Sequence, residues 1–138
     1  PQSTPALDYT AFDWNTPGAS RRSIYRYVWR GIADPFMEAL DFPDLGLLSP
    51  ARSFSASSLQ ALTLYNNDFV LHHAERMALK IQGEHDAFES QVTQSVRLVW
   101  LREPTSDELQ NFGEFTRTNG LPALCRLLLN SNEFLFVD

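Results

Sequence analysis

The stretch LCRLLLNSNEFLF, residues 124–136, decides the fold class because it echoes a pattern from the middle of the chain. Residues 59–71, LQALTLYNNDFVL, have the same order: an apolar run at helical spacing, a polar step that contains Asn, and then a Phe. An Asn-containing step can end one helix and cap a new turn. The two stretches therefore predict two helix–step–Phe units of one helical core, with Phe69 and Phe134 buried. Chance recurrence in a Leu-rich helical protein is the alternative explanation.

Size and charge limit the class of protein. The 138 residues, 43% of them apolar, are enough for one domain with a single core. The net charge of −6 and the pI near 4.9 would repel a phosphate backbone, so nucleic acid is not an expected partner. No apolar run approaches the roughly 20 residues that span a bilayer, so we expect no membrane span.

Residues 1–20 are rich in Pro, Ser and Thr, a composition typical of an extended arm or linker. Tyr9, Phe12 and Trp14 make this arm too apolar for a free linker, so we expect it to lie along the domain or along neighbouring sequence. Residues 21–138 are then expected to form a single helical domain. The chain begins with Pro1 and shows no signal peptide, which indicates a piece of a longer protein.

The fold class predicted from periodicity and caps is mainly α, a small domain of about five helices. The expected helices cover residues 34–42, 58–81, 86–101, 105–118 and 121–129. The second is either bent or divided at the polar triplet 66–68, and a break centred on Gly83 separates it from the third. Thr105 and Glu108 have capping-box spacing, and Asn119-Gly120 is typical of a helix C-terminus.

The segment RRSIYRYVWR, residues 21–30, fits either a strand or a helix. Tyr25, Tyr27 and Trp29 alternate as on a strand, whereas Ile24 and Val28 have helical spacing. Aromatic and β-branched enrichment favours one short strand near residues 23–29.

Few residues have the spacing of a catalytic or metal site. His72, His73 and Glu75 lack the i, i+4 pair of helical zinc ligands, so a half-buried His on a helix surface is the favoured interpretation. The single Cys125 excludes covalent haem and fits a buried, unreactive thiol. Haem bound without a covalent link would need His72, His73 or His85, and we expect no cofactor in this chain.

Arginines are the more suggestive polar residues. Arg21, Arg22, Arg26 and Arg30 are interleaved with aromatic residues, and Arg52 precedes a Ser-rich helix start. Guanidinium groups beside aromatic rings suit carboxylate, sulfate or sugar ligands, and they equally suit ion pairs with an acidic neighbouring domain.

Five blocks of sequence together resemble the PSD1 domain, also called DUF1553, a C-terminal region of large secreted proteins of planctomycetes. The blocks, which lie within residues 20–138, are RRSIYRYVWR, DPFMEALDFPD, LSPARSFSASSLQALTLYNNDFVL, WLREPTSDEL and LCRLLLNSNEFLFVD. The characteristic polar residues of the family correspond to five positions of this chain, which are the predicted ligand-binding residues: Arg21, Arg22, Arg52, Gln60 and Asn67.

The resemblance implies a periplasmic or secreted protein with an upstream DUF1549 domain and often a cytochrome c-like domain. Any haem would then belong to that fused or partner domain. The residues indicate no reaction. Three functions follow as hypotheses: docking on the missing upstream domain or on another chain, a part in a polysaccharide-acting enzyme, and an electron-transfer module.

Overall fold

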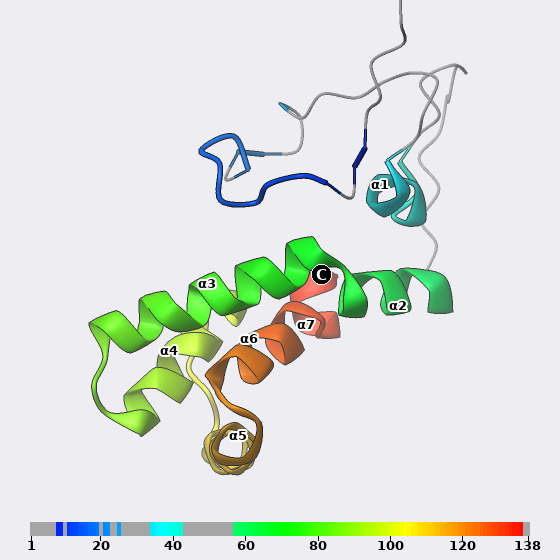
Figure 1. The fold of residues 1–138 in the computed structure, drawn as a ribbon. Coiled ribbons are helices and arrows are strands. Elements are labelled where there is room, and N and C mark those ends of the chain that lie inside the picture. The colour runs from blue at the N-terminus through cyan, green and yellow to red at the C-terminus, as the bar shows by residue number, and fades with distance from the viewer. Residues whose placement is uncertain are drawn as a thin grey trace, which may run out of the picture. The chain divides into compact units, whose positions relative to one another are not determined.

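A computed structural model describes residues 8–9, 11–19, 21–22, 25, 34–42 and 57–136. It divides into two compact units, unit 1 over Pro1–Thr63 and unit 2 over Leu64–Asp138. The described residues contain seven helices and no strand (Figure 1), which confirms the mainly α class. The proposed boundary between an arm, 1–20, and one domain, 21–138, stays a prediction.

Unit 1 contains the short helix α1, Pro35–Ala39, as the sequence predicted. The Asp34 side chain caps it by accepting a hydrogen bond from the Phe36 N–H at 3.0 Å. Pro35 stands in the first turn, where backbone N–H groups have no acceptor within the helix, so the absence of an N–H on proline costs no hydrogen bond. The helix ends at Ala39, before Pro43 as expected, with Leu40 as its C-cap and Asp41 in the left-handed region at φ 58°.

The described part of the predicted arm consists of turns. The Asn15 N–H donates to Asp13 Oδ1 at 2.9 Å, which closes a local turn through the side chain. Further along, the Tyr25 N–H donates to the Arg22 carbonyl at 2.9 Å. Except for Tyr25, the strand predicted near residues 23–29 lies outside the described residues.

The polar triplet divides the second predicted helix into α2, Ser58–Asn66, and α3, Asp68–Glu84. Asn67 lies between them, and its side chain caps α3 by accepting from the Phe69 N–H at 2.9 Å. The predicted break after this helix is present, but it covers residues 85–87 and is not centred on Gly83, since α3 continues to Glu84. A glycine in the last turn costs about 1 kcal/mol relative to Ala, which is too little to end a helix of 17 residues.

Unit 2 continues with α4, Phe88–Trp100, and α5, Ser106–Asn119. The predicted capping box of α5 is confirmed: Glu108 N–H donates to Thr105 Oγ1 at 3.3 Å, and Thr105 N–H donates to Glu108 Oε2 at 2.8 Å. Gly120 then has φ 86° and ψ 161°, a conformation that is essentially restricted to glycine. It ends α5 and allows the next helix to begin at once.

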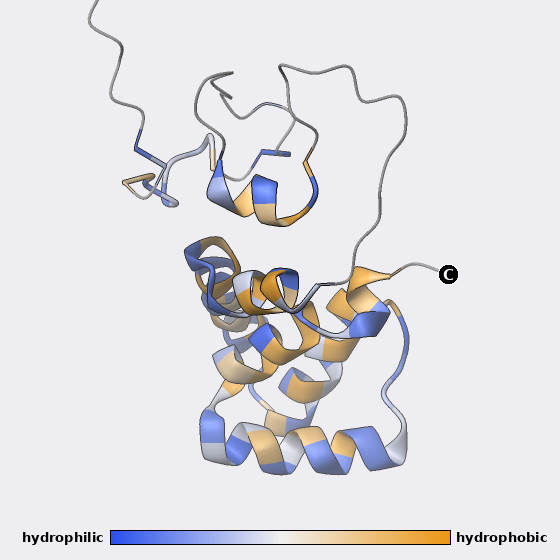
Figure 2. Ribbon diagram, turned by 90° about the vertical axis from the view of Figure 1, so that its right-hand side faces the viewer, coloured by the Kyte–Doolittle hydropathy of each residue, from blue (hydrophilic) through white to orange (hydrophobic). Residues whose placement is uncertain are grey.

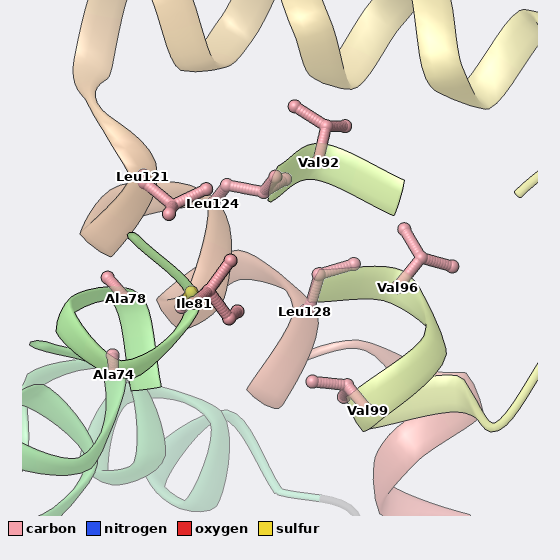
Figure 3. Packing of buried hydrophobic residues seen from close by; sticks show 10 residues of the cluster. Ala74, Ala78, Ile81, Val92, Val96, Val99, Leu121, Leu124 and Leu128 are labelled. Atoms are coloured by element: carbon pink, nitrogen blue, oxygen red, sulfur yellow. The ribbon is translucent and has the colours of Figure 1, made fainter. Parts of the chain in front are cut away.

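The core of unit 2 lies around α6, Leu121–Leu129, which packs against α3, α4 and α5. Figure 3 shows side chains from α3, α4 and α6 meeting in this interior. The buried cluster consists of Ala74, Ala78 and Ile81 from α3, Val92, Val96 and Val99 from α4, and Leu121, Leu124, Cys125 and Leu128 from α6.

A final short helix, α7, spans Asn132–Leu135 and was not predicted. Phe69 is half-buried, with its ring 4.4 Å from that of His73. The burial predicted for Phe134 is wrong, because 43% of this residue is exposed. The reason is that Trp100 already packs on the core and donates its indole N–H to Ser131 Oγ at 2.7 Å, which closes the interior just before α7 begins.

We expect Leu124→Ala to lower the free energy of unfolding by about 2–5 kcal/mol, because it removes a fully buried side chain and leaves a cavity. Urea unfolding followed by circular dichroism measures this change. Leu127→Ala, on the exposed side of the same helix, is the control and should cost less than about 1 kcal/mol. Equal losses for the two variants would contradict the position assigned to α6.

Candidate functional site

Arg102, in the turn between α4 and α5, uses all five of its guanidinium N–H groups. Nε and Nη2 donate to the Glu133 carboxylate at 2.6 and 3.0 Å, and Nη1 and Nη2 donate to the Glu108 carboxylate at 2.8 and 2.7 Å. The fifth bond runs from Nη1 to the Glu103 carbonyl at 3.0 Å. Arg102, which lies in the α4–α5 turn, is therefore joined by one bidentate pair to the first turn of α5 and by a second bidentate pair to α7.

Trp100 supports the same cluster from the end of α4. The Arg102 guanidinium lies 4.7 Å from the centre of the Trp100 ring, and this ring meets Phe112 edge to face at 5.7 Å. The hydrogen bond from the indole to Ser131 connects the end of α4 to the junction of α6 and α7. We call Trp100, Arg102, Glu108, Ser131 and Glu133 the Arg102 cluster.

The Arg102 cluster changes the ionisation of its members. Hydrogen bonds from Arg102 and from the Thr105 N–H lower the pKa of Glu108 from its ordinary value of 4.5 to about 2. Hydrogen bonds to Glu108 and Glu133 raise the pKa of Arg102. Glu108 is ionised at neutral pH, which suits it to ion pairing and not to donating a proton in general acid catalysis.

Beside this cluster is a groove of about 670 Å³, which we call the C-terminal groove. It is lined by Val99, Trp100, Leu101, Asn132, Glu133, Phe134 and Phe136. Figure 2 shows hydrophobic residues near the C label, where the last helix ends. The lining is therefore mostly apolar, with polar groups from the first residues of α7.

A smaller hollow of about 290 Å³ lies between α4 and α5, and we call it the α4–α5 hollow. Its lining includes Phe88 and Glu89 from α4, and Gln110 and Arg117 from α5. The Arg117 guanidinium lies 5.0 Å from the centre of the Phe88 ring. An aromatic ring, a guanidinium, a carboxylate and an amide are thus gathered around one surface depression.

Two of the predicted ligand-binding residues, Gln60 and Asn67, have structural roles. Gln60 forms a capping box with Ser57, in which each side chain bonds the other's backbone N–H at 3.2 Å. Its amide also donates to Asp41 Oδ2 at 2.8 Å. Asn67 caps α3, so helix ends account for both side chains.

The predicted arginine site is described only in part. Arg21 and Arg22 are exposed residues of unit 1, and their backbone takes part in turns. Arg52 lies outside the described residues. A ligand-binding role for the five predicted residues stays a prediction.

The histidines and the cysteine behave as parts of the helical packing. The rings of His72 and His73 meet edge to face at 5.4 Å, and burial, followed by the neighbouring His72 and Arg76, lowers the pKa of His73. Cys125 is buried as predicted, and burial raises the pKa of its thiol to about 11. In the described ranges, no three His, Cys, Asp or Glu side chains are grouped as metal ligands, and no helix there is long and apolar enough to span a membrane.

Sequence reasoning missed Arg102 and Trp100, although both lie in the quoted block WLREPTSDEL. A usable signal was present: an Arg between a Trp and the Glu of a capping box. The partner Glu133 is 31 residues away, and no local pattern connects it to Arg102.

The family comparison agrees with the sequence blocks. PSD1, described as a protein of unknown function (DUF1553), matches residues 3–116. The chain belongs to the PSD1 family. The matched range contains four of the five blocks and stops before LCRLLLNSNEFLFVD. Comparison with curated proteins and with solved structures gives no match.

The lowered pKa of Glu108 predicts how stability depends on pH. The ionised carboxylate stabilises the fold above about pH 4.5, and this contribution is lost as the pH falls towards 2. We expect Glu108→Gln to lower the melting temperature at pH 7 by about 3 °C and to flatten its fall below pH 4.5. Thermal unfolding followed by circular dichroism from pH 2 to 7 measures both.

The matched control is Glu103→Gln, which removes the carboxylate that pairs with Arg97 at 2.6 Å on the exposed surface. This pair should contribute little. The same loss of acid-dependent stability in both variants would contradict a special role for the Arg102 cluster.

Proposed function

We propose that this PSD1 chain is a docking domain of a larger extracytoplasmic protein and that α2 is the helix that docks. The observation that carries the proposal is the composition and exposure of α2. Its sequence, SLQALTLYN, has no charged residue, and none of its residues is buried. Helices that are apolar without a charged face are ordinarily covered by other structure.

The apolar residues of α2 form a stripe. Leu59 and Leu62 are one turn apart and are 62% and 60% exposed, and Tyr65 follows at the same spacing. This arrangement suits a helix whose exposed apolar residues lie in an apolar groove of a partner. We call these three residues the α2 stripe.

Arg126 fixes the end of this helix. Its guanidinium stacks on the Tyr65 ring at 3.7 Å and donates to the Tyr65 carbonyl, with Nε at 2.9 Å. The C-terminal end of α2 is thus held against α6, whereas Leu59 and Leu62 stay exposed. A helix that is held in advance loses less conformational entropy when a partner covers it.

The partner that we propose is another folded domain of the same protein, with an uncharged apolar groove that accepts one helix. The absence of charge on α2 supports an apolar partner, since a charged groove would be desolvated without compensation. The resemblance to secreted proteins supports the extracytoplasmic location.

Hydrogen exchange tests the docking of α2. We expect amide exchange in α2 to be at least tenfold slower in the intact protein than in the 138-residue chain alone. Leu59→Gln/Leu62→Gln should abolish this protection, because Gln keeps helix propensity and removes the apolar contact. Exchange in α5 is the control and should be the same in all samples. Equal exchange of α2 in the intact protein and in the chain alone would contradict the proposal.

A second candidate function, a contribution to polysaccharide binding, is supported by the α4–α5 hollow. Phe88 offers an aromatic surface, and Gln110 and Arg117 offer hydrogen-bond donors beside it. A few polar groups beside aromatic lining are typical of small-ligand sites. The hollow has the composition for one sugar unit of a longer chain.

Glycan-array binding tests this second function. Binding that is lost in Arg117→Ala and kept in Arg22→Ala would place the sugar in the hollow, whereas the reverse result would favour the arginines of unit 1. A chain that binds no glycan would contradict a direct role in polysaccharide binding and would leave the docking proposal unaffected.

A further inference from the structure

Leu101 has an unfavourable backbone conformation and an exposed side chain. It ends α4 with φ 56° and ψ 25°, in the left-handed region where glycine is favoured because a Cβ crowds the carbonyl oxygen. Its side chain is 87% exposed. The Leu101 N–H closes α4 by donating to the Arg97 carbonyl at 3.1 Å, so the backbone of Leu101 ends the helix while its side chain stays uncovered among the described residues.

Leu101 stands at the rim of the C-terminal groove. The opposite wall of this groove is apolar as well, since Phe134 and Phe136 line it. A protruding apolar side chain and an apolar groove therefore lie side by side on one surface. Such a surface is complementary to itself under a two-fold axis, because each copy can place its Leu in the groove of the other.

The charge at the groove favours a second copy of this chain over a strongly charged partner. Arg102 is paired with Glu108 and Glu133, and the exposed Arg97 is paired with Glu103 at 2.6 Å. Glu133, the charged residue in the groove lining, is thus already paired within the chain. A charge that is paired in this way does not steer a strongly basic or acidic partner towards the groove.

The exposed apolar area is close to the lower limit for a specific dimer. The exposed apolar side chains at this end of unit 2 are Leu98, Leu101, Phe134, Leu135 and Phe136. Together they present on the order of 500 Å² per copy, if a fully exposed large side chain offers about 200 Å². Two copies would then bury about 1,000 Å², which suits a weak and reversible dimer.

We propose that the C-terminal groove binds a second copy of this chain in a two-fold arrangement, with Leu101 of each copy seated in the groove of the other. This contact uses a different surface from the α2 stripe and does not depend on the docking function.

Sedimentation velocity on the Leu59→Gln/Leu62→Gln chain tests the proposal, because this background removes association through α2. Between about 5 µM and about 1 mM we expect a monomer–dimer equilibrium with Kd on the order of 100 µM. Leu101→Gly in the same background should weaken dimerisation at least tenfold. It should also raise the melting temperature of the monomer by about 3 °C, because glycine relieves the left-handed strain.

These opposite effects on dimerisation and stability separate a lost contact from a damaged fold. Leu79→Gln, which replaces a 64% exposed leucine on α3, is the matched control and should leave the Kd unchanged. A chain that stays monomeric at all concentrations overturns the proposal, and so does a dimer that Leu101→Gly leaves intact. Neither result would change the hydrogen exchange that we expect for α2, because dimerisation through the groove and docking of α2 use different surfaces.

Discussion

Burial of one face of α6 is the constraint on which unit 2 depends. Leu124, Cys125 and Leu128 are fully buried, and α6 packs on the three helices that precede it in the chain, α3, α4 and α5. Without α6, the apolar faces of α3, α4 and α5 would lose the surface that they share. The PSD1 match ends at residue 116, before this helix begins. The residues beyond the match therefore complete the core that the matched helices need.

Polar contacts at helix ends complement this apolar interior. Arg126 extends from α6 to the Tyr65 carbonyl of α2, and Arg102 connects the α4–α5 turn to α7. Each guanidinium also lies on an aromatic ring, Tyr65 or Trp100, which orients its planar fork. Short helices such as α7 are not stable alone, so these contacts hold them in place.

The same architecture leaves two apolar surfaces uncovered within the described residues, the α2 stripe and the C-terminal groove. Arg126 holds Tyr65 of the α2 stripe, and the Arg102 cluster borders the C-terminal groove through Trp100 and Glu133. A surface that is held in advance loses less conformational entropy when a partner binds. These two surfaces are the basis of the two associations that we propose, and PSD1 membership assigns no reaction to the chain.

Local patterns by themselves determined most helices and several of their ends. Asp34, Thr105 with Glu108, and Gly120 act on backbone groups within a few residues, so their roles can be recognised in the sequence. Only the tertiary structure decided that Arg102 pairs with Glu133 and that Phe134 remains at the surface. The physical reason is that both outcomes depend on the end of α4 lying next to α7. There Trp100 packs on the core and leaves Phe134 outside it.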